Sequence, residues 1–264
     1  MPTLNAVTAA LEHLAPLRLA AAWDAVGLLV APRRGEVERV MTCLTLTPEV
    51  AAEAVRERAD LVVSHHPLPF RPVPRITPAT GPGRVLLELI GAGAGIWSSH
   101  TAWDSAAGGI NDQLAGLLGL AHVAPIEPDP VLPEVGFGRI GTAAEGCTVA
   151  DLAGRAAGAL GVRHVQIAGE PHRPAGRVGI VCGSGGDCVE QVARGGCDTL
   201  FTGEVKLHQA TEAWAAGMAV VAVGHHASER FSMDVLAERL AAAVDGLSCW
   251  ASRDERDPLC GSRS

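Results

Sequence analysis

The sequence contains no tyrosine, and aromatic residues make up only 3% of its 264 residues. Apolar residues nevertheless account for 48% of the chain, and much of this content is alanine, valine and leucine. We therefore expect a core built from small aliphatic side chains. A chain of this length buries a sizeable core, as one large domain or two medium ones.

Runs of lysine and arginine are also absent, and the formal net charge is −8 with a pI near 5.7. A nucleic-acid-binding surface has to neutralise phosphates, so this charge balance argues against nucleic acid as a direct partner. No apolar stretch approaches the ~20 residues of a membrane span, and no basic region precedes an apolar segment at the N-terminus. The sequence therefore favours a cytoplasmic protein that does not enter a membrane.

The seven cysteines are odd in number and include no Cys-x-x-Cys pair. Disulfide frameworks and cysteine-ligated zinc sites both need paired cysteines, so we expect neither. The pattern predicts small thiols, buried or half-buried, in a reducing compartment.

Helix-like and strand-like patterns alternate along the chain. Apolar spacing predicts a helix over 4–15, and Pro48 stands at the favoured first position of another. Such alternation predicts an α/β protein with mixed or parallel sheets. Residues 125–136 are proline-rich and acidic, and we place a domain boundary or a crossover there. The expected domains are 1–128 and 129–264, and the end of the second could pack back on the first.

Five of the ten histidines lie in three short stretches, at 64–70 (SHHPLPF), 99–104 (SHTAWD) and 224–229 (GHHASE). Each stretch directly follows an apolar, strand-like run. In open α/β sheets, ligands and chemistry gather beyond the carboxyl ends of the strands. The three stretches therefore predict a dinuclear metal centre.

Adjacent histidines on a strand point to opposite faces, so His65 and His66 can serve one site only where the chain leaves the strand. Pro67 favours such an exit. Two neighbouring imidazoles could then each bind a different ion of a metal pair.

A histidine stands four residues before a carboxylate in both of the other stretches, in the pairs His100–Asp104 and His225–Glu229. This spacing puts both side chains on one face of a helical turn. Asp104 alone is equally typical of a helix cap, and Glu229 of an acid in a first helical turn. His226 is expected to be structural or to support a ligand.

Six short motifs resemble, in their order and separations, those of one protein family. They are WDAVGL at 23–28, HHPLPF at 65–70, SHTAWD at 99–104, TGEVKLH at 202–208, GHHASE at 224–229 and DERDPL at 254–259. They are similar to the motifs of the Nif-three-like family, often called GTP cyclohydrolase I type 2 homologues. The resemblance implies two related α/β domains in the short, two-domain form, with a dinuclear metal site in the cleft between them. It also implies a homohexamer, a trimer of dimers, with the sites facing an internal cavity.

The resemblance further assigns roles to individual residues. The implied metal ligands are His65, His66, Asp104, His225 and Glu229. His100 is either a further ligand or a proton-handling neighbour. Glu204 is implied at the edge of the site in a catalytic role, with His208 as a possible partner, although a glutamate that opens a helix is ordinary. The cofactor would be two divalent metal ions per subunit: zinc, iron, manganese or nickel.

This sequence departs from the family pattern at Ala25, where the usual WDNxGL motif has an asparagine. The change removes an amide that could position a substrate, which weakens inference of the substrate from relatives. The leading hypothesis is a metal-dependent hydrolase acting on a nucleotide or a related heterocycle, with GTP ring opening as the candidate reaction. The alternative is a non-catalytic metal-binding, metal-delivery or regulatory hexamer. A third possibility is that the metals only hold the two halves of the chain together.

Overall fold

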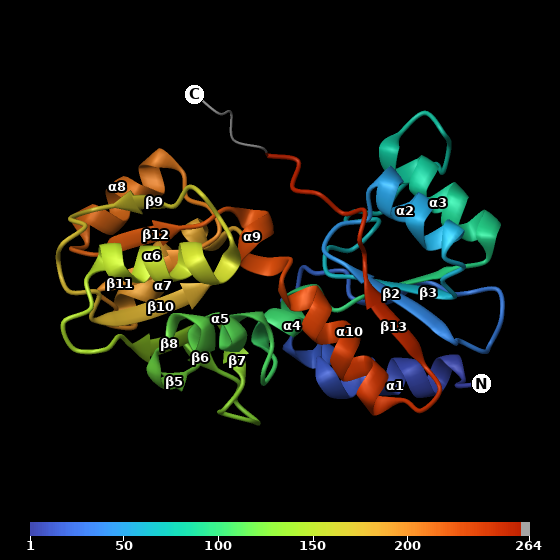
Figure 1. The fold of residues 1–264 in the computed structure, drawn as a ribbon, viewed down its shortest axis with the longest axis horizontal. Helices are drawn as coiled ribbons and strands as arrows, with labels where there is room; N and C mark the ends of the chain where they lie inside the picture. Colours follow the sequence, from blue (N-terminus) through green and yellow to red (C-terminus); the bar gives the residue numbers. More distant parts are fainter. Residues whose placement is uncertain (260–264) are drawn as a thin grey trace. The chain divides into compact units, whose positions relative to one another are not determined.

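The computed structural model in Figure 1 describes residues 1–259 and divides into two compact units. Unit 1 comprises Met1–Trp103 together with the segment that starts at Ser232, and unit 2 comprises Asp104–Phe231. The chain therefore leaves unit 1 after Trp103 and returns to it after Phe231. No helix among the described residues combines the length and apolarity needed to span a membrane.

Unit 1 contains a five-stranded mixed sheet with the strand order β1-β4-β3-β2-β13. Its elements in chain order are α1 (Leu4–Leu14), a 3-10 turn (Leu17–Leu19), β1 (Gly27–Val30), β2 (Arg39–Cys43), α2 (Pro48–Arg56), β3 (Leu61–Ser64), α3 (Gly81–Ala92), β4 (Gly95–Ser98), α4 (His100–Ser105, which ends in unit 2), α10 (Ser232–Ala243) and β13 (Ser248–Ala251). β1 is antiparallel to β4, whereas the pairs β4–β3, β3–β2 and β2–β13 are parallel.

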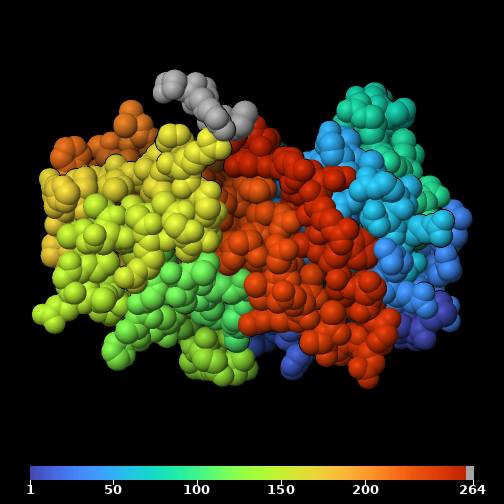
Figure 2. Space-filling view, viewed as in Figure 1, coloured from blue at the N-terminus to red at the C-terminus, as the bar shows by residue number. Residues whose placement is uncertain are grey.

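Helices α2 and α3 cover one face of this sheet. Their apolar side chains, such as Val50 and Leu89, pack with Met41, Val62 and Ile96 from the strands in a buried cluster. Figure 1 shows α1 and α10 on the other face. In Figure 2 the red C-terminal segment lies at the surface of unit 1 beside the blue residues of β2 and α2. The C-terminal strand β13 is thus an integral part of the sheet of unit 1.

Unit 2 contains a six-stranded mixed sheet with the order β5-β8-β10-β11-β12-β9 and a two-stranded sheet, β6-β7. Its elements are α5 (Ile110–Leu118), β5 (Ala121–Ala124), β6 (Glu127–Pro128), β7 (Gly136–Phe137), β8 (Arg139–Thr142), α6 (Val149–Leu160), β9 (Gln166–Ala168), β10 (Arg177–Val181), a 3-10 turn (Gly185–Cys188), α7 (Val189–Arg194), β11 (Thr199–Thr202), α8 (Leu207–Ala215), β12 (Ala219–Ala222) and α9 (His225–Glu229). The neighbours β10, β11 and β12 are parallel, and the other pairs are antiparallel.

The core of unit 2 is built from small aliphatic side chains, as the composition predicts. Ile140, Leu200 and Val220 from the sheet pack with Val192 of α7 and Ala213 of α8 in one buried cluster. The α/β class with mixed sheets is confirmed in both units. The six described cysteines are free thiols, buried or half-buried.

The proline-rich segment 125–136 lies inside unit 2, where it forms β6 and the connection to β7. The prolines and acids therefore shape a hairpin rather than a link between units. The compact units divide at 103/104 and 231/232, not at the 128/129 boundary expected from the sequence. The C-terminal residues from Ser232 pack back on the N-terminal part of the chain.

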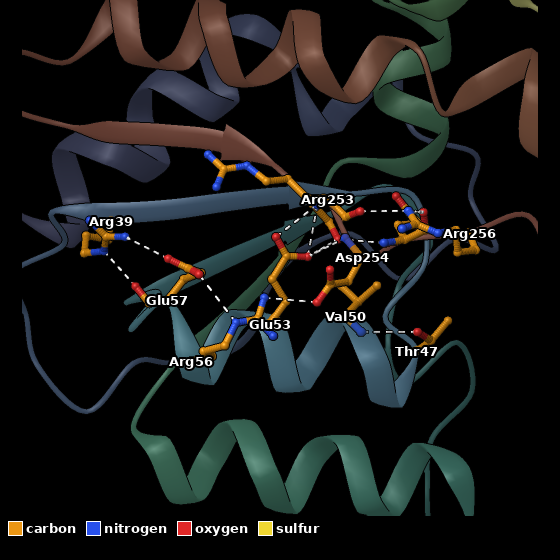
Figure 3. Close-up of polar contacts among 11 residues, drawn as sticks. Arg39, Thr47, Val50, Glu53, Arg56, Glu57, Arg253, Asp254 and Arg256 are labelled. Atoms are coloured by element: carbon orange, nitrogen blue, oxygen red, sulfur yellow. Dashed lines mark hydrogen bonds and ion pairs between the residues drawn. The ribbon is translucent and has the colours of Figure 1, made fainter.

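A buried carboxylate on α2 anchors the chain after β13 (Figure 3). Glu53 is 1% exposed and accepts hydrogen bonds from the Ser252 hydroxyl (2.5 Å) and from the backbone N–H groups of Arg253 and Asp254 (both 3.0 Å). Burial alone would raise the pKa of Glu53, but these donors outweigh it and hold the pKa below its ordinary value. An ion pair between Arg56 and Asp254 (3.0 Å) adds a second link at the surface.

We expect Glu53→Gln to destabilise the protein by about 2 kcal/mol at pH 7, because an amide NH₂ would face N–H donors that the carboxylate now satisfies. The folded pKa lies below the ordinary 4.5, so the contribution of the carboxylate is present above pH 4.5 and is lost as the pH falls through the folded pKa. Urea unfolding of wild type and variant between pH 7 and pH 3 should therefore show a shrinking difference.

Glu57→Gln is the matched control on the same helix. Glu57 forms longer, partly exposed ion pairs with Arg56 (3.5 Å) and Arg39 (3.9 Å), so its loss should cost less than about 0.5 kcal/mol. Equal effects of the two substitutions would contradict the anchoring role of Glu53.

Candidate metal centre

Three histidines meet at the carboxyl ends of β3 and β4 in unit 1. The two strands are parallel neighbours with Ser64 opposite Ser98, so the residues that follow them emerge at the same edge of the sheet. The potential ligand atoms of His65, His66 and His100 all lie within 4.8 Å of one another. Their ring centroids are 5.2 to 5.6 Å apart. This histidine triad offers three imidazole side chains, a donor type that suits a divalent transition metal.

The chain leaves strand β3 at Ser64, as the sequence requires if both following histidines are to serve one site. The His65 N–H still donates to the Cys43 carbonyl (2.8 Å), and the His66 N–H donates to the Leu44 carbonyl (2.9 Å). These bonds tie the exit of β3 to the exit of β2. His65 is 2% exposed, so the triad is partly enclosed.

Asp24 fixes the orientation of His100. Its carboxylate lies 2.7 Å from His100 Nδ1 and also accepts from the hydroxyl (2.6 Å) and the N–H (3.2 Å) of Thr101. Burial would raise the pKa of Asp24, but the bonds from His100 and Thr101 lower it overall, so the group is a carboxylate. Because a carboxylate only accepts, Nδ1 of His100 carries a proton, and Nε2 is the ring nitrogen that would bind a metal.

The backbone of His100 is strained. Its φ is 29°, a left-handed value that costs a non-glycine residue about 1–3 kcal/mol. The hydrogen bonds of Asp24 to His100 and Thr101 bridge the start of α4 and offset this cost.

The second group of donors lies at the carboxyl ends of the parallel strands β10, β11 and β12 in unit 2. His225 Nε2 is 3.1 Å from a carboxylate oxygen of Glu229, one helical turn later, and His225 Nδ1 is 3.3 Å from Glu204. Ser184 donates to Glu204 at 2.6 Å. Glu229 is 4% exposed, whereas half of the Glu204 side chain is exposed. Glu204 is therefore the more exposed of the two carboxylates beside His225.

The hydrogen bond to Glu229, helped by Glu204, raises the pKa of His225 to about 9 in the absence of metal. The Ser184 hydroxyl and His225 in turn lower the pKa of Glu204. His225 is therefore a cation at neutral pH, and a metal ion that binds it must displace its proton.

Gly183 is a glycine because the backbone passes directly against the ligands. Its φ is +60°, and a Cβ there would lie 2.2 Å from Glu229 Oε1 and 3.1 Å from His225 Nε2. Any side chain at this position would displace both ligand atoms.

Asp104 is held by a buried network within unit 2. The Cys182 thiol lies 3.2 Å from Asp104 Oδ1. The side chain of Asn111 donates to the Asp104 carbonyl (3.1 Å) and accepts from the Cys182 N–H (3.0 Å). Burial, and then the charges of Asp104 and Glu229, raise the pKa of the Cys182 thiol well above its ordinary value. In the absence of metal the thiol is therefore protonated and donates its hydrogen bond to Asp104.

The donors present fit hard or borderline divalent cations. Imidazole nitrogens and carboxylate oxygens suit zinc, iron, manganese and nickel. The outer hydrogen bonds to His100 and Asp104 are of the kind that orient metal ligands in proteins.

Several residues take partners that the sequence does not reveal. Glu204 contacts Ser184 and His225, whereas the sequence offered His208 as its partner. His226 buries its Nε2 without a hydrogen-bond partner among residues 1–259. The sequence also contains no signal for the contacts of Cys182 with Asp104 and Asn111, because they join segments 78 and 71 residues apart in the chain.

A model of the family described as Duf34/NIF3 (NGG1p interacting factor 3) matches residues 2–258. The chain belongs to the DUF34/NIF3 family. It is 31% identical over 257 residues to a "GTP cyclohydrolase 1 type 2 homolog" of Clostridium perfringens, covering 97% of this chain and 98% of the relative. It is 37% identical to a protein of the same name from Streptomyces coelicolor, covering 87% and 82%.

Family membership agrees with the fold. The crystal structure of a Bacillus cereus protein related to NIF3 superposes with a TM-score of 0.91 over 99% of both chains at 21% sequence identity. The family identification based on the six sequence motifs is therefore confirmed.

In metal-free protein, Glu229→Gln should move the pKa of His225 from about 9 toward its ordinary 6.5, because the largest stabilising partner of the imidazolium is neutralised. NMR titration of the histidine ring signals measures this shift. In the wild type, the pair stabilises the fold below pH 6.5, and this contribution is lost as the pH rises through 9. Glu212→Gln on the exposed face of α8 is the control, and an unchanged His225 titration in Glu229→Gln would refute the pairing.

Proposed function

We propose that this DUF34/NIF3 protein binds two divalent metal ions and uses them to hydrolyse a nucleotide or a related heterocycle. The observation that carries the proposal is the histidine triad, in which three potential ligand atoms lie within 4.8 Å. The His225–Glu229 pair and Asp104 would complete the ligand set from unit 2. In this proposal the two groups of donors face a common cleft between two related α/β domains.

Two divalent ions held in this way would activate a water molecule for attack and stabilise the negative charge that develops on the substrate. Residues of this chain would orient the ligands and handle the proton. Asp24 orients His100 as a nitrogen donor, and the Cys182 thiol steadies Asp104. Glu204 is assigned the proton-handling role, because it is ionised, half-exposed and hydrogen-bonded to Ser184.

Two exposed aromatic rings beside the triad support a planar substrate. Trp23 is 67% exposed and Phe70 is 52% exposed, in a chain with few aromatic residues. Their ring centroids lie 6.0 and 6.2 Å from that of His100. Stacking of a base on an aromatic side chain contributes about 1–3 kcal/mol. The names of the curated relatives make GTP the first substrate to test.

We also propose self-association into a homohexamer, a trimer of dimers, on the basis of family membership. Sedimentation equilibrium of the metal-loaded protein would measure the assembly directly.

Metal analysis of protein purified without added metal tests the proposal. We expect about two divalent ions per chain in the wild type. Asp104→Asn and Glu229→Gln keep the shape of each side chain but remove its charge, so each should lose at least half of the bound metal. Glu190→Gln, on the exposed start of α7, is the control and should keep it.

The same samples should be assayed for turnover of GTP and other nucleotides. Activity that falls with metal content across the variants supports a hydrolase. A wild type that holds two ions but turns over none of these compounds would contradict the enzymatic role and favour the non-catalytic alternative. Metal content that ignores both substitutions would overturn the site itself.

A further inference from the structure

We infer that Glu255, near the C-terminus, is a positioning residue of the metal centre. It acts through Leu44 and Thr45 to set the ring of His66. The inference deepens the proposed function, since it names residues that prepare one ligand of the proposed site. It rests on contacts within unit 1 alone.

The carboxylate of Glu255 accepts two hydrogen bonds from the loop that follows β2. Its Oε2 accepts from the Leu44 N–H at 3.0 Å, and its Oε1 accepts from the Thr45 N–H at 2.7 Å. Glu255 is only 8% exposed, and its contacts with Leu44 are fully buried. Two hydrogen bonds from consecutive N–H groups to one buried side chain fix the backbone of this loop.

The same two loop residues hold His66. The Leu44 carbonyl accepts from the His66 N–H at 2.9 Å. The Thr45 hydroxyl lies 2.8 Å from His66 Nδ1. One residue thus fixes the backbone of the histidine and the next fixes its ring. With Nδ1–H donating to Thr45, the lone pair of Nε2 is the one available for a metal.

Glu255 is itself anchored on both sides. Its own N–H donates to the Ser252 hydroxyl (3.2 Å), which donates in turn to buried Glu53 (2.5 Å), close to the contacts drawn in Figure 3. The Ser252 N–H continues the pairing of β13 with β2 by donating to the Thr42 carbonyl (2.8 Å). The segment Ser252–Glu255 is therefore locked to β2 and α2 just before Glu255 reaches the loop.

These contacts make a continuous path from Glu53 to the histidine triad. If Glu255 and Thr45 served folding alone, substituting either would lower stability, while the protein that still folds would bind metal normally. A positioning role predicts that removing the Thr45 hydroxyl weakens metal binding, because the path is broken at its last bond while Glu255 and the loop backbone remain.

The first experiment is zinc titration of the full chain against a competing chelator. Substitution of residues that orient a ligand typically lowers metal affinity 10–100-fold, so we expect Thr45→Val to bind zinc at least 10-fold more weakly. Thr45→Ser keeps the hydroxyl and should stay within about 3-fold of wild type. Glu255→Gln should also weaken binding, and the effects of the two substitutions should add only in part, because Glu255 acts on His66 both through the Thr45 hydroxyl and through the Leu44 carbonyl.

Thr47→Val is the matched control in the same loop. The Thr47 hydroxyl caps α2 by accepting from the Val50 N–H (3.3 Å). It should lower stability and leave zinc affinity unchanged. Equal zinc affinity in wild type, Thr45→Val and Glu255→Gln would overturn the inference.

The second experiment needs no bound metal. Two-dimensional ¹⁵N NMR of the metal-free protein should show His66 with its proton on Nδ1, and this proton should move toward Nε2 in Thr45→Val but not in Thr47→Val. A wild type that binds no zinc but shows this tautomer change would refute the proposed function and keep the positioning role. An unchanged tautomer in Thr45→Val would overturn the positioning role, whatever the metal content.

Discussion

The parallel pairing of β3 with both of its neighbours is the constraint on which the candidate metal centre depends. Pairing with β4 places the residues after both strands at one edge of the sheet, where His65 and His66 meet His100. Pairing with β2 places the Leu44–Thr45 loop beside the same exit. Unit 2 repeats the arrangement with β10, β11 and β12, whose carboxyl ends lead to Gly183, Glu204 and His225. In both units the sheet fixes the position of the candidate ligands, which lie in the short segments that follow the strands.

Residues that contact the histidine rings control which ring nitrogen of each histidine can bind a metal. Asp24 holds His100 through Nδ1, and Thr45 contacts His66 through Nδ1. In both cases Nε2 remains as the donor atom. His225 differs, because carboxylates lie near both of its nitrogens and raise its pKa. Metal binding in unit 2 is thus expected to compete with a proton.

The sequence predicted those features that are encoded locally. Apolar runs followed by histidines identified the strand ends, and the four-residue spacing of His225 and Glu229 predicted an interaction that the structure contains. The α/β class followed from the alternation of patterns. Two-residue and four-residue spacings are visible in a single sequence because they repeat within one strand or helix.

The features that the sequence did not predict depend on contacts between distant segments. His100 and Asp24 are 76 residues apart, and Glu53 and Ser252 are 199 residues apart. Glu255 stood out only as part of the DERDPL motif, and its acceptor role depends on β13 returning to β2. The proline-rich segment alone predicts a boundary or a crossover, because prolines end strands in hairpins and in linkers alike.

The central claim is that this chain prepares a metal centre of imidazoles and carboxylates and keeps its nearby thiol out of the ligand set. X-ray absorption spectroscopy of the zinc-loaded protein tests this most directly. The account predicts nitrogen and oxygen neighbours only, with the multiple-scattering signal of about two imidazoles per zinc ion. A sulfur neighbour at about 2.3 Å, or a spectrum without imidazole scattering, would contradict it.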